Sequence, residues 1–134
     1  MGNERMKLDG FGLFVKDLET MVAFYRDVLG FAIDWKPGEA NVYLRKDGTV
    51  FMMYGRKDFE KMTRRAYSYA EGIHGHFEIA LAVPRSSDVD ATFAQVTALG
   101  AVPVLLPENE PWGQRTCYVA DPEGNLIEIG SFQP

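Results

Sequence analysis

The first hydrophobic pattern in the chain is an alternation of apolar and polar positions over residues 7–15. A period of two residues indicates a β-strand, because successive side chains of a strand point to opposite faces. The face suited to a core carries Phe11, Leu13 and Val15. Apolar residues then recur at helical spacing over 18–29, between Asp17 as N-cap and Gly30 as the stop. The pattern predicts a strand followed by a helix.

Shorter apolar runs after this helix predict three further strands, over residues 31–35, 40–45 and 49–54. Pro37 and Gly38 separate the first two runs, and Asp47 and Gly48 separate the last two, as expected for turns. Residues 7–55 are therefore predicted to form one β-α-β-β-β module.

The same order returns after an interruption. Residues 56–75 are polar and rich in charge, with at most a short helix near 58–65, and are predicted to connect two modules. Residues 76–132 again read as a strand, a helix that ends at Gly100, and three strands. Recurrence of one order at similar spacing marks an internal repeat. The chain, 1–134, is therefore predicted to be a single domain of two modules.

The repeat predicts the fold class. Neither module can bury both faces of its own sheet, so the two must share a core. We expect an α+β fold in which two βαβββ modules form one curved mixed sheet. The helices are expected outside this sheet, and a cleft inside it.

Composition narrows the class of partner. Hydrophobic residues make up 46% and charged residues 25% of the chain, as in ordinary globular proteins. The net charge of -5 argues against nucleic acid or an anionic membrane as partner. No apolar run is long enough to span a bilayer or typical of a signal peptide. The single cysteine, Cys117, is expected in the core and fits a cytoplasmic protein.

Three stretches together resemble a known superfamily: LFVKDLETMVAFYRDVLGF (13–31), HFEIALAV to DVDATFAQVTALGA (76–101), and PWGQRTCYVADPEGNLIEI (111–129). They are similar to the vicinal oxygen chelate superfamily, which contains glyoxalase I, the bleomycin resistance proteins and the extradiol dioxygenases. The resemblance implies paired βαβββ modules, a small-molecule ligand in the pocket of the curved sheet, and a homodimer.

The resemblance also implies four inward-facing metal-ligand positions in metal-binding members, two from each module. The internal repeat places Gly10 and Met52 at these positions in the first module, and Glu78 and Glu128 in the second. Glycine offers no ligand, and a thioether does not suit hard or borderline ions. We therefore expect no resident metal or other cofactor, although Glu78 and Glu128 with waters could hold Mg²⁺ or Mn²⁺ weakly.

Two kinds of candidate site residue follow. Glu78 or Glu128 is the candidate catalytic base for a substrate with adjacent oxygens. The candidate ligand contacts are apolar and aromatic side chains of both modules and one cation: Phe14, Met52, Tyr54, Trp112, Arg115 and Tyr118. Arg115 suits an anionic group, and Trp112 suits the mouth of a cleft.

Three functions remain open. The chain is expected to be a lyase or isomerase of the lactoylglutathione-lyase type with a degraded metal site, a protein that sequesters a drug or metabolite, or a dioxygenase-like enzyme. Structural alternatives stand beside them. Glu78 and Glu128 could be ordinary polar residues of a solvated sheet face, and Trp112 could pack its loop on the core. The apolar face of the first module could form a core or dimer contact; it comprises Phe14, Tyr43, Met52 and Tyr54.

Overall fold

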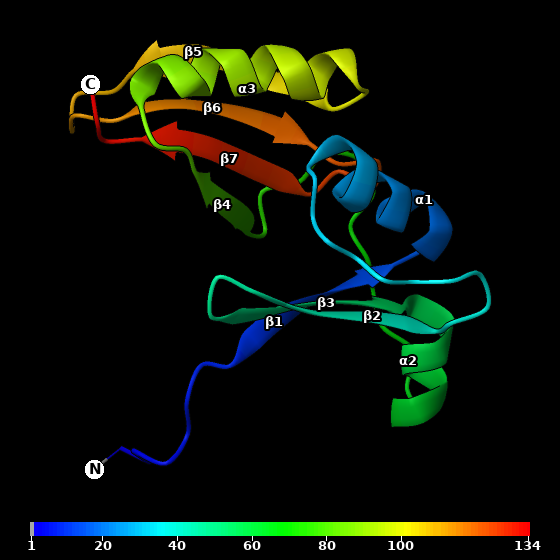
Figure 1. The fold of residues 1–134 in the computed structure, drawn as a ribbon. Coiled ribbons are helices and arrows are strands. Elements are labelled where there is room, and N and C mark those ends of the chain that lie inside the picture. The colour runs from blue at the N-terminus through cyan, green and yellow to red at the C-terminus, as the bar shows by residue number, and fades with distance from the viewer. Residues whose placement is uncertain (1) are drawn as a thin grey trace.

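The computed structural model describes residues 2–134. Along the chain the elements are β1 (Gly10–Val15), α1 (Leu18–Ala23), η1 (Phe24–Val28), β2 (Asn41–Lys46), β3 (Thr49–Gly55), α2 (Arg56–Thr63), β4 (Glu78–Ala82), α3 (Ser86–Ala98), β5 (Val102–Asn109), β6 (Arg115–Ala120) and β7 (Leu126–Ser131) (Figure 1). The short π-helical turn η1 continues α1 directly. The predicted α+β class is confirmed, and the predicted helix in the connection is α2.

One expected strand is not formed. Residues 31–35 leave η1 without pairing to any strand, so the first module has three strands instead of four. Phe31 and Ile33 are both buried, and Trp35 is half-buried. The alternation in this segment arises because alternate side chains enter the core, and side-chain burial alone does not require a ladder partner.

The strands form two sheets. Sheet A has the order β1-β3-β2, and sheet B has the order β4-β7-β6-β5. In each sheet the module's first strand pairs in parallel with its last strand, and the remaining pairs are antiparallel. Within residues 2–134 no ladder joins the edge of β1 to the edge of β4. The single curved sheet that we expected is therefore divided at the boundary between the modules.

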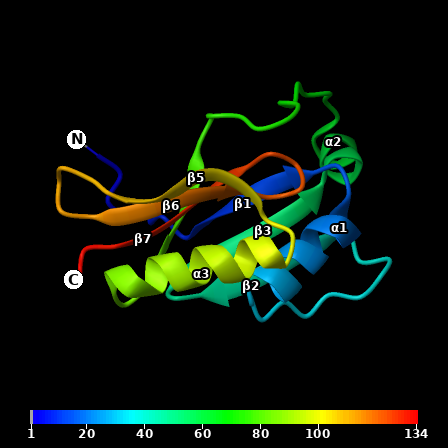
Figure 2. The ribbon, with the colours of Figure 1, turned by 90° about the horizontal axis from the view of Figure 1, so that it is seen from above.

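The helices α1 and α3 lie in the angle between sheet A and sheet B (Figures 1 and 2). Residues of both modules form one buried cluster there, in which Tyr25 and Phe31 contact Phe51 at ring distances of 5.0 and 5.2 Å. Each helix buries one side: Met21 and Val22 of α1 and Val89 and Val96 of α3 are buried, so each sheet has one core face. As expected, α1 and α3 lie on one side of the sheets and leave the opposite face of each sheet free of both helices.

Cys117 belongs to this core, as expected. Its thiol is fully buried and donates to the carbonyl oxygen of Ile129 at 3.6 Å. Burial raises the pKa of the Cys117 thiol to about 11. With this pKa the thiol stays protonated at neutral pH, and only the thiolate is a nucleophile. Cys117 therefore contributes packing and not reactivity.

The turn between β6 and β7 connects the two modules. Buried Asp121 accepts hydrogen bonds from the hydroxyl of Tyr25 at 2.7 Å and from the backbone and side-chain amides of Asn125 at 3.1 and 2.8 Å. Glu123 accepts from the backbone N–H groups of Lys16 and Asp17, both at 2.8 Å. The end of β1 is thereby fixed to the second module.

Among residues 2–134, no helix has the length and apolar character that crossing a membrane requires.

Candidate functional site

The outer face of sheet B, which looks away from α3, carries two carboxylates. Ile127 and Ile129 of β7 point into the core, so Glu128 between them points outward. Glu78 of β4 lies on the same face, because it pairs with Leu126 two positions from Glu128. We name this surface the carboxylate wall; it comprises Glu78, Thr116, Tyr118 and Glu128. The two carboxylates share one wall and do not face each other across a cleft within one chain.

Each carboxylate accepts a hydrogen bond from a hydroxyl group of β6. Thr116 Oγ1 donates to Glu128 Oε2, and Tyr118 donates to Glu78 Oε1, both at 2.9 Å. Burial raises the pKa of Tyr118 well above its usual range, and the hydrogen bond to Glu78 and the charge of Glu128 raise it further. Tyr118 therefore stays protonated at neutral pH and holds Glu78 in place as a donor.

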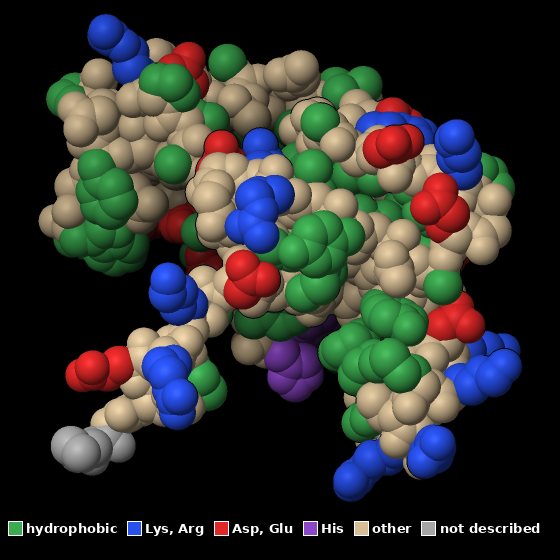
Figure 3. Space-filling model, turned by 60° about the horizontal axis from the view of Figure 1, so that its bottom comes forward, with side chains coloured by type: hydrophobic (Ala, Val, Ile, Leu, Met, Phe, Trp, Pro, Cys, Tyr) green, Lys and Arg blue, Asp and Glu red, His purple; other side chains and the backbone are tan. Residues whose placement is uncertain are grey.

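The wall continues toward the loop between β5 and β6. Glu108 pairs with Thr116 across the β5–β6 ladder and so lies on the same face. Gln114 lies against Gly130, and it accepts a hydrogen bond from the indole N–H of Trp112 at 2.9 Å. Trp112 is 63% exposed, so its ring borders the wall and is free to contact a ligand. Figure 3 shows acidic side chains recessed beside hydrophobic ones at the upper left of that view.

No cation of residues 2–134 forms an ion pair with Glu78, Glu108 or Glu128. The wall therefore presents hydrogen-bond acceptors and negative charge with no internal neutralisation.

The outer face of sheet A forms a second candidate surface, the apolar wall, which comprises Phe14, Tyr43, Met52 and Tyr54. The register places Phe14 beside Tyr54, and Tyr43 beside Met52. Tyr43 is 62% exposed. At Gly10, a Cβ would clash with the carbonyl oxygen of Val50. The position that the family pattern reserves for a ligand therefore has no room for a side chain.

Helix α2 covers one end of the apolar wall. The ring of Phe59 stacks on Phe14 with centroids 4.0 Å apart, and meets the ring of Tyr54 edge-on at 5.8 Å. Phe14 and Tyr54 are thus already in contact with protein, while Met52 and Tyr43 remain open to a ligand or a partner.

The structure corrects the role expected for Arg115. Its side chain points toward α3, where Nε and Nη2 donate to the carboxylate of Asp90 at 2.6 and 2.8 Å. In β6, Arg115 alternates with Thr116 and shares the core-side face with Cys117. Arg115 therefore fastens α3 to sheet B and does not reach the carboxylate wall.

Sequence reasoning missed several residues of these walls. Thr116 and Gln114 share the parity of Tyr118 along β6, so the alternation that selected Tyr118 could have found them. Glu108 follows a register shift in β5, which hides its face from any count of residues. Phe59 lies in the charged connection, where no sequence pattern predicts its packing on Phe14.

The residues do not fit the four-ligand metal centre that the resemblance implies. Gly10 and Met52 stand at two of the positions, and residues 2–134 contain no group of three or more His, Cys, Asp or Glu side chains suited to a metal ion. The imidazole of His74 is engaged elsewhere, since its Nε2 is hydrogen-bonded to Asn125 Oδ1 at 2.9 Å.

Comparison with known proteins identifies the family. The model of the Glyoxalase/Bleomycin resistance protein/Dioxygenase superfamily matches residues 7–129. The uncharacterized protein YraH of Bacillus subtilis (strain 168) is 30% identical over 131 residues, covering 92% of this chain and 97% of that protein. A glyoxalase-related enzyme from Fulvimarina pelagi has a TM-score of 0.80 at 22% identity, over 93% of this chain and 87% of that one. Lactoylglutathione lyase from Agrobacterium tumefaciens has a TM-score of 0.72 at 22% identity, over 93% and 92%. The chain belongs to the Glyoxalase/Bleomycin resistance protein/Dioxygenase superfamily.

Proposed function

We propose that this protein binds a small organic molecule that carries positively charged or neutral hydrogen-bond donors, and that the carboxylate wall is its binding surface. The observation that carries the proposal is the set of three carboxylates, Glu78, Glu108 and Glu128, on one face without a protein cation beside them. Such a surface favours donors and repels anions. The exposed indole of Trp112 would add a face for a cation to stack on.

Replacing Glu128 by glutamine is the direct test. The side chain keeps its size, so the fold should be retained, while the charge that strengthens a hydrogen bond to a cationic donor is lost. We expect ligand affinity to fall roughly 10- to 100-fold, since hydrogen bonds to charged groups contribute about 1.5–3 kcal/mol. The ligand is first found by titrating the wild type with a panel of amines, guanidines and their carboxylate counterparts in a calorimeter.

The matched control is Asp34→Asn, which neutralises an exposed carboxylate outside both walls. It should bind as the wild type does. Equal binding by Glu128→Gln and wild type, or a preference of the wild type for the carboxylate counterparts, would refute the proposed role of the wall.

Sequestration accounts for the site better than metal-dependent lyase or dioxygenase chemistry. The likeness to Lactoylglutathione lyase, at 22% identity, concerns the fold, and residues 2–134 hold no group of three or more His, Cys, Asp or Glu side chains suited to a metal ion. A bound molecule recovered chemically unchanged after prolonged incubation would support sequestration, and a converted one would favour an enzyme with Glu78 or Glu128 as base.

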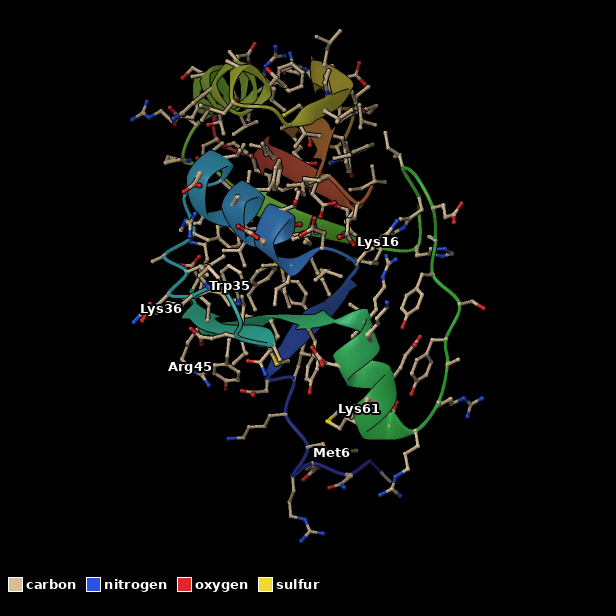
Figure 4. The ribbon with its side chains drawn as sticks, turned by 90° about the vertical axis from the view of Figure 1, so that its right-hand side faces the viewer. Met6, Lys16, Trp35, Lys36, Arg45 and Lys61 are labelled. Atoms are coloured by element: carbon tan, nitrogen blue, oxygen red, sulfur yellow. The ribbon has the colours of Figure 1, made fainter. Side chains whose placement is uncertain are left out.

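We further propose that a second copy of the chain completes the cleft. In one chain the carboxylate wall and the apolar wall both look away from the angle that holds α1 and α3 (Figures 1 and 4), so neither wall faces the other. A twofold axis would set the apolar wall of one copy opposite the carboxylate wall of the other. The open aromatic surface at Tyr43 supports such a contact.

Light scattering should therefore report a mass of about 30 kDa, twice the 15.1 kDa of one chain. Tyr43→Glu should shift the protein toward monomer, because it would set a new negative charge opposite the carboxylate wall. A wild type that is monomeric at micromolar concentration, or a Tyr43→Glu variant as dimeric as the wild type, would contradict this arrangement.

A further inference from the structure

Beyond its first residue, Arg56, helix α2 contacts the apolar wall through two side chains, Phe59 and Met62. None of its residues is fully buried. Phe59 supplies the stack on Phe14, and the sulfur of Met62 accepts a long hydrogen bond of 3.7 Å from the hydroxyl of Tyr54. Met62 itself is 60% exposed. The helix therefore lies on the wall without being built into the core.

The two ends of α2 are held differently. At its start, Arg56 donates through Nε to the carbonyl oxygen of Phe14 at 3.2 Å, pairs with Glu123 at 3.4 Å, and lies over the ring of Tyr69 at 4.3 Å. At its end, Arg64 adopts a left-handed conformation with φ 57°. Arg56 therefore provides a fixed pivot at one end.

The bonds near the free end join α2 to the segment that follows it. The hydroxyl of Tyr69 donates to Glu60 at 2.7 Å, and the hydroxyl of Tyr67 donates to Thr63 at 2.8 Å. The ring of Phe59 also contacts the ring of Tyr67 at 5.4 Å. These contacts are internal to residues 56–69, so they do not resist movement of this unit away from sheet A. Figure 4 shows α2, with Lys61, projecting below sheet A.

Space is present beside the stack. A cavity of about 170 Å³ borders Phe14, between β1 and the segment that follows α2, and its lining includes Gly12, Tyr69 and Phe77. Gly12 leaves the surface of β1 low at this point. Phe14 therefore borders a recess of mixed polar and aromatic lining, and Phe59, which stacks on Phe14, does not line it.

We propose that α2 is a movable cover of the apolar wall, and that Phe59 holds the stacking place on Phe14 that an aromatic ring of a ligand takes when the cover opens. The inference rests on the proposed binding function and adds the ligand class: a donor-bearing molecule with a flat aromatic part. One aromatic pair shifts an equilibrium by only about 2- to 12-fold, so a ligand ring can compete with Phe59.

The test measures binding of Nile red, an uncharged aromatic dye, by fluorescence titration. Phe59→Ala should bind the dye roughly fivefold more tightly than the wild type, because the dye no longer displaces a stacked ring. The matched control is Phe132→Ala, which removes a 63% exposed phenylalanine at the C-terminal end; it should leave dye affinity unchanged. The proposal would be overturned if Phe59→Ala bound Nile red no more tightly than the wild type, or did not bind it at all.

Hydrogen–deuterium exchange of the wild-type protein without ligand gives a second, independent readout. Backbone amides of residues 57–63 should exchange at least tenfold faster than those of residues 50–54 in β3, because a cover opens without global unfolding. Equal protection of the two segments would show that α2 is a fixed part of the fold.

The two proposals fail separately. The dye carries no charge, so its binding does not depend on the carboxylates. If Glu128→Gln bound cationic ligands as tightly as the wild type, the proposed binding function would fail, and the proposal that α2 is a movable cover would still stand. Conversely, weaker cation binding by Glu128→Gln together with unchanged Nile red affinity in Phe59→Ala would support the binding function and refute the movable cover.

Discussion

Asp121→Ala should lower the free energy of unfolding by roughly 3–5 kcal/mol, the range found when a buried hydrogen-bond network loses its central member. Asp121 is 2% exposed and accepts from four donors: the hydroxyl of Tyr25, the backbone N–H groups of Glu123 and Asn125, and the side-chain amide of Asn125. Alanine leaves these groups buried without an acceptor. Urea unfolding monitored by circular dichroism measures the loss.

A conservative variant separates the contribution of the hydrogen-bond network from the contribution of side-chain volume. Asp121→Asn keeps the size and one carbonyl oxygen, so it should cost clearly less than alanine. Tyr25→Phe removes a single donor and should cost about 1–2 kcal/mol. A loss below about 1 kcal/mol in Asp121→Ala would show that water replaces the carboxylate, and that the turn does not hold the modules together.

Gly124→Ala should be the most damaging glycine substitution in the chain, with a loss of roughly 3–5 kcal/mol from overpacking and backbone strain combined. Gly124 has φ +87°, and a Cβ there would clash with the carbonyl oxygen of Gly72. The contact joins the β6–β7 turn to the connection between the modules, where His74 N–H also donates to the carbonyl oxygen of Gly124 at 3.1 Å. The connection would have to move to admit a methyl group.

Gly38→Ala is the matched control, because Gly38 has φ +98° and no atom within 4 Å of a built Cβ. It shares the unfavourable backbone conformation and lacks the clash, so it should cost only about 1 kcal/mol. Comparing the two midpoints of urea unfolding isolates the steric term. If Gly124→Ala and Gly38→Ala lost the same free energy of unfolding, residues 72–73 would move aside at no cost. The turn and the connection would then not be tightly packed against each other.

The sequence by itself determined which face of each strand carries which side chain. Once 125–131 is read as a strand between Gly124 and the C-terminus, the period of two fixes Glu128 opposite Ile127 and Ile129, and the same argument sets Tyr118 opposite Cys117. Turns at Asp47-Gly48 and Asp121–Gly124 set the strand order, because short hairpin turns impose antiparallel neighbours. The family resemblance added the pairing of the modules.

Only the tertiary structure decided what each face meets. Alternation is equally satisfied by a pocket, a helix or water, so it could not show that α1 and α3 fill the angle between the sheets and leave both candidate walls outward. Arg115 and Asp90 are separated by 25 residues, and Phe59 reaches Phe14 across 45; neither contact leaves a local pattern. Apolar and polar residues alternate over 31–35 because alternate side chains are buried, although this segment pairs with no strand. Local periodicity shows which face of an element is buried. It does not show which element covers that face, because long-range packing decides the partner.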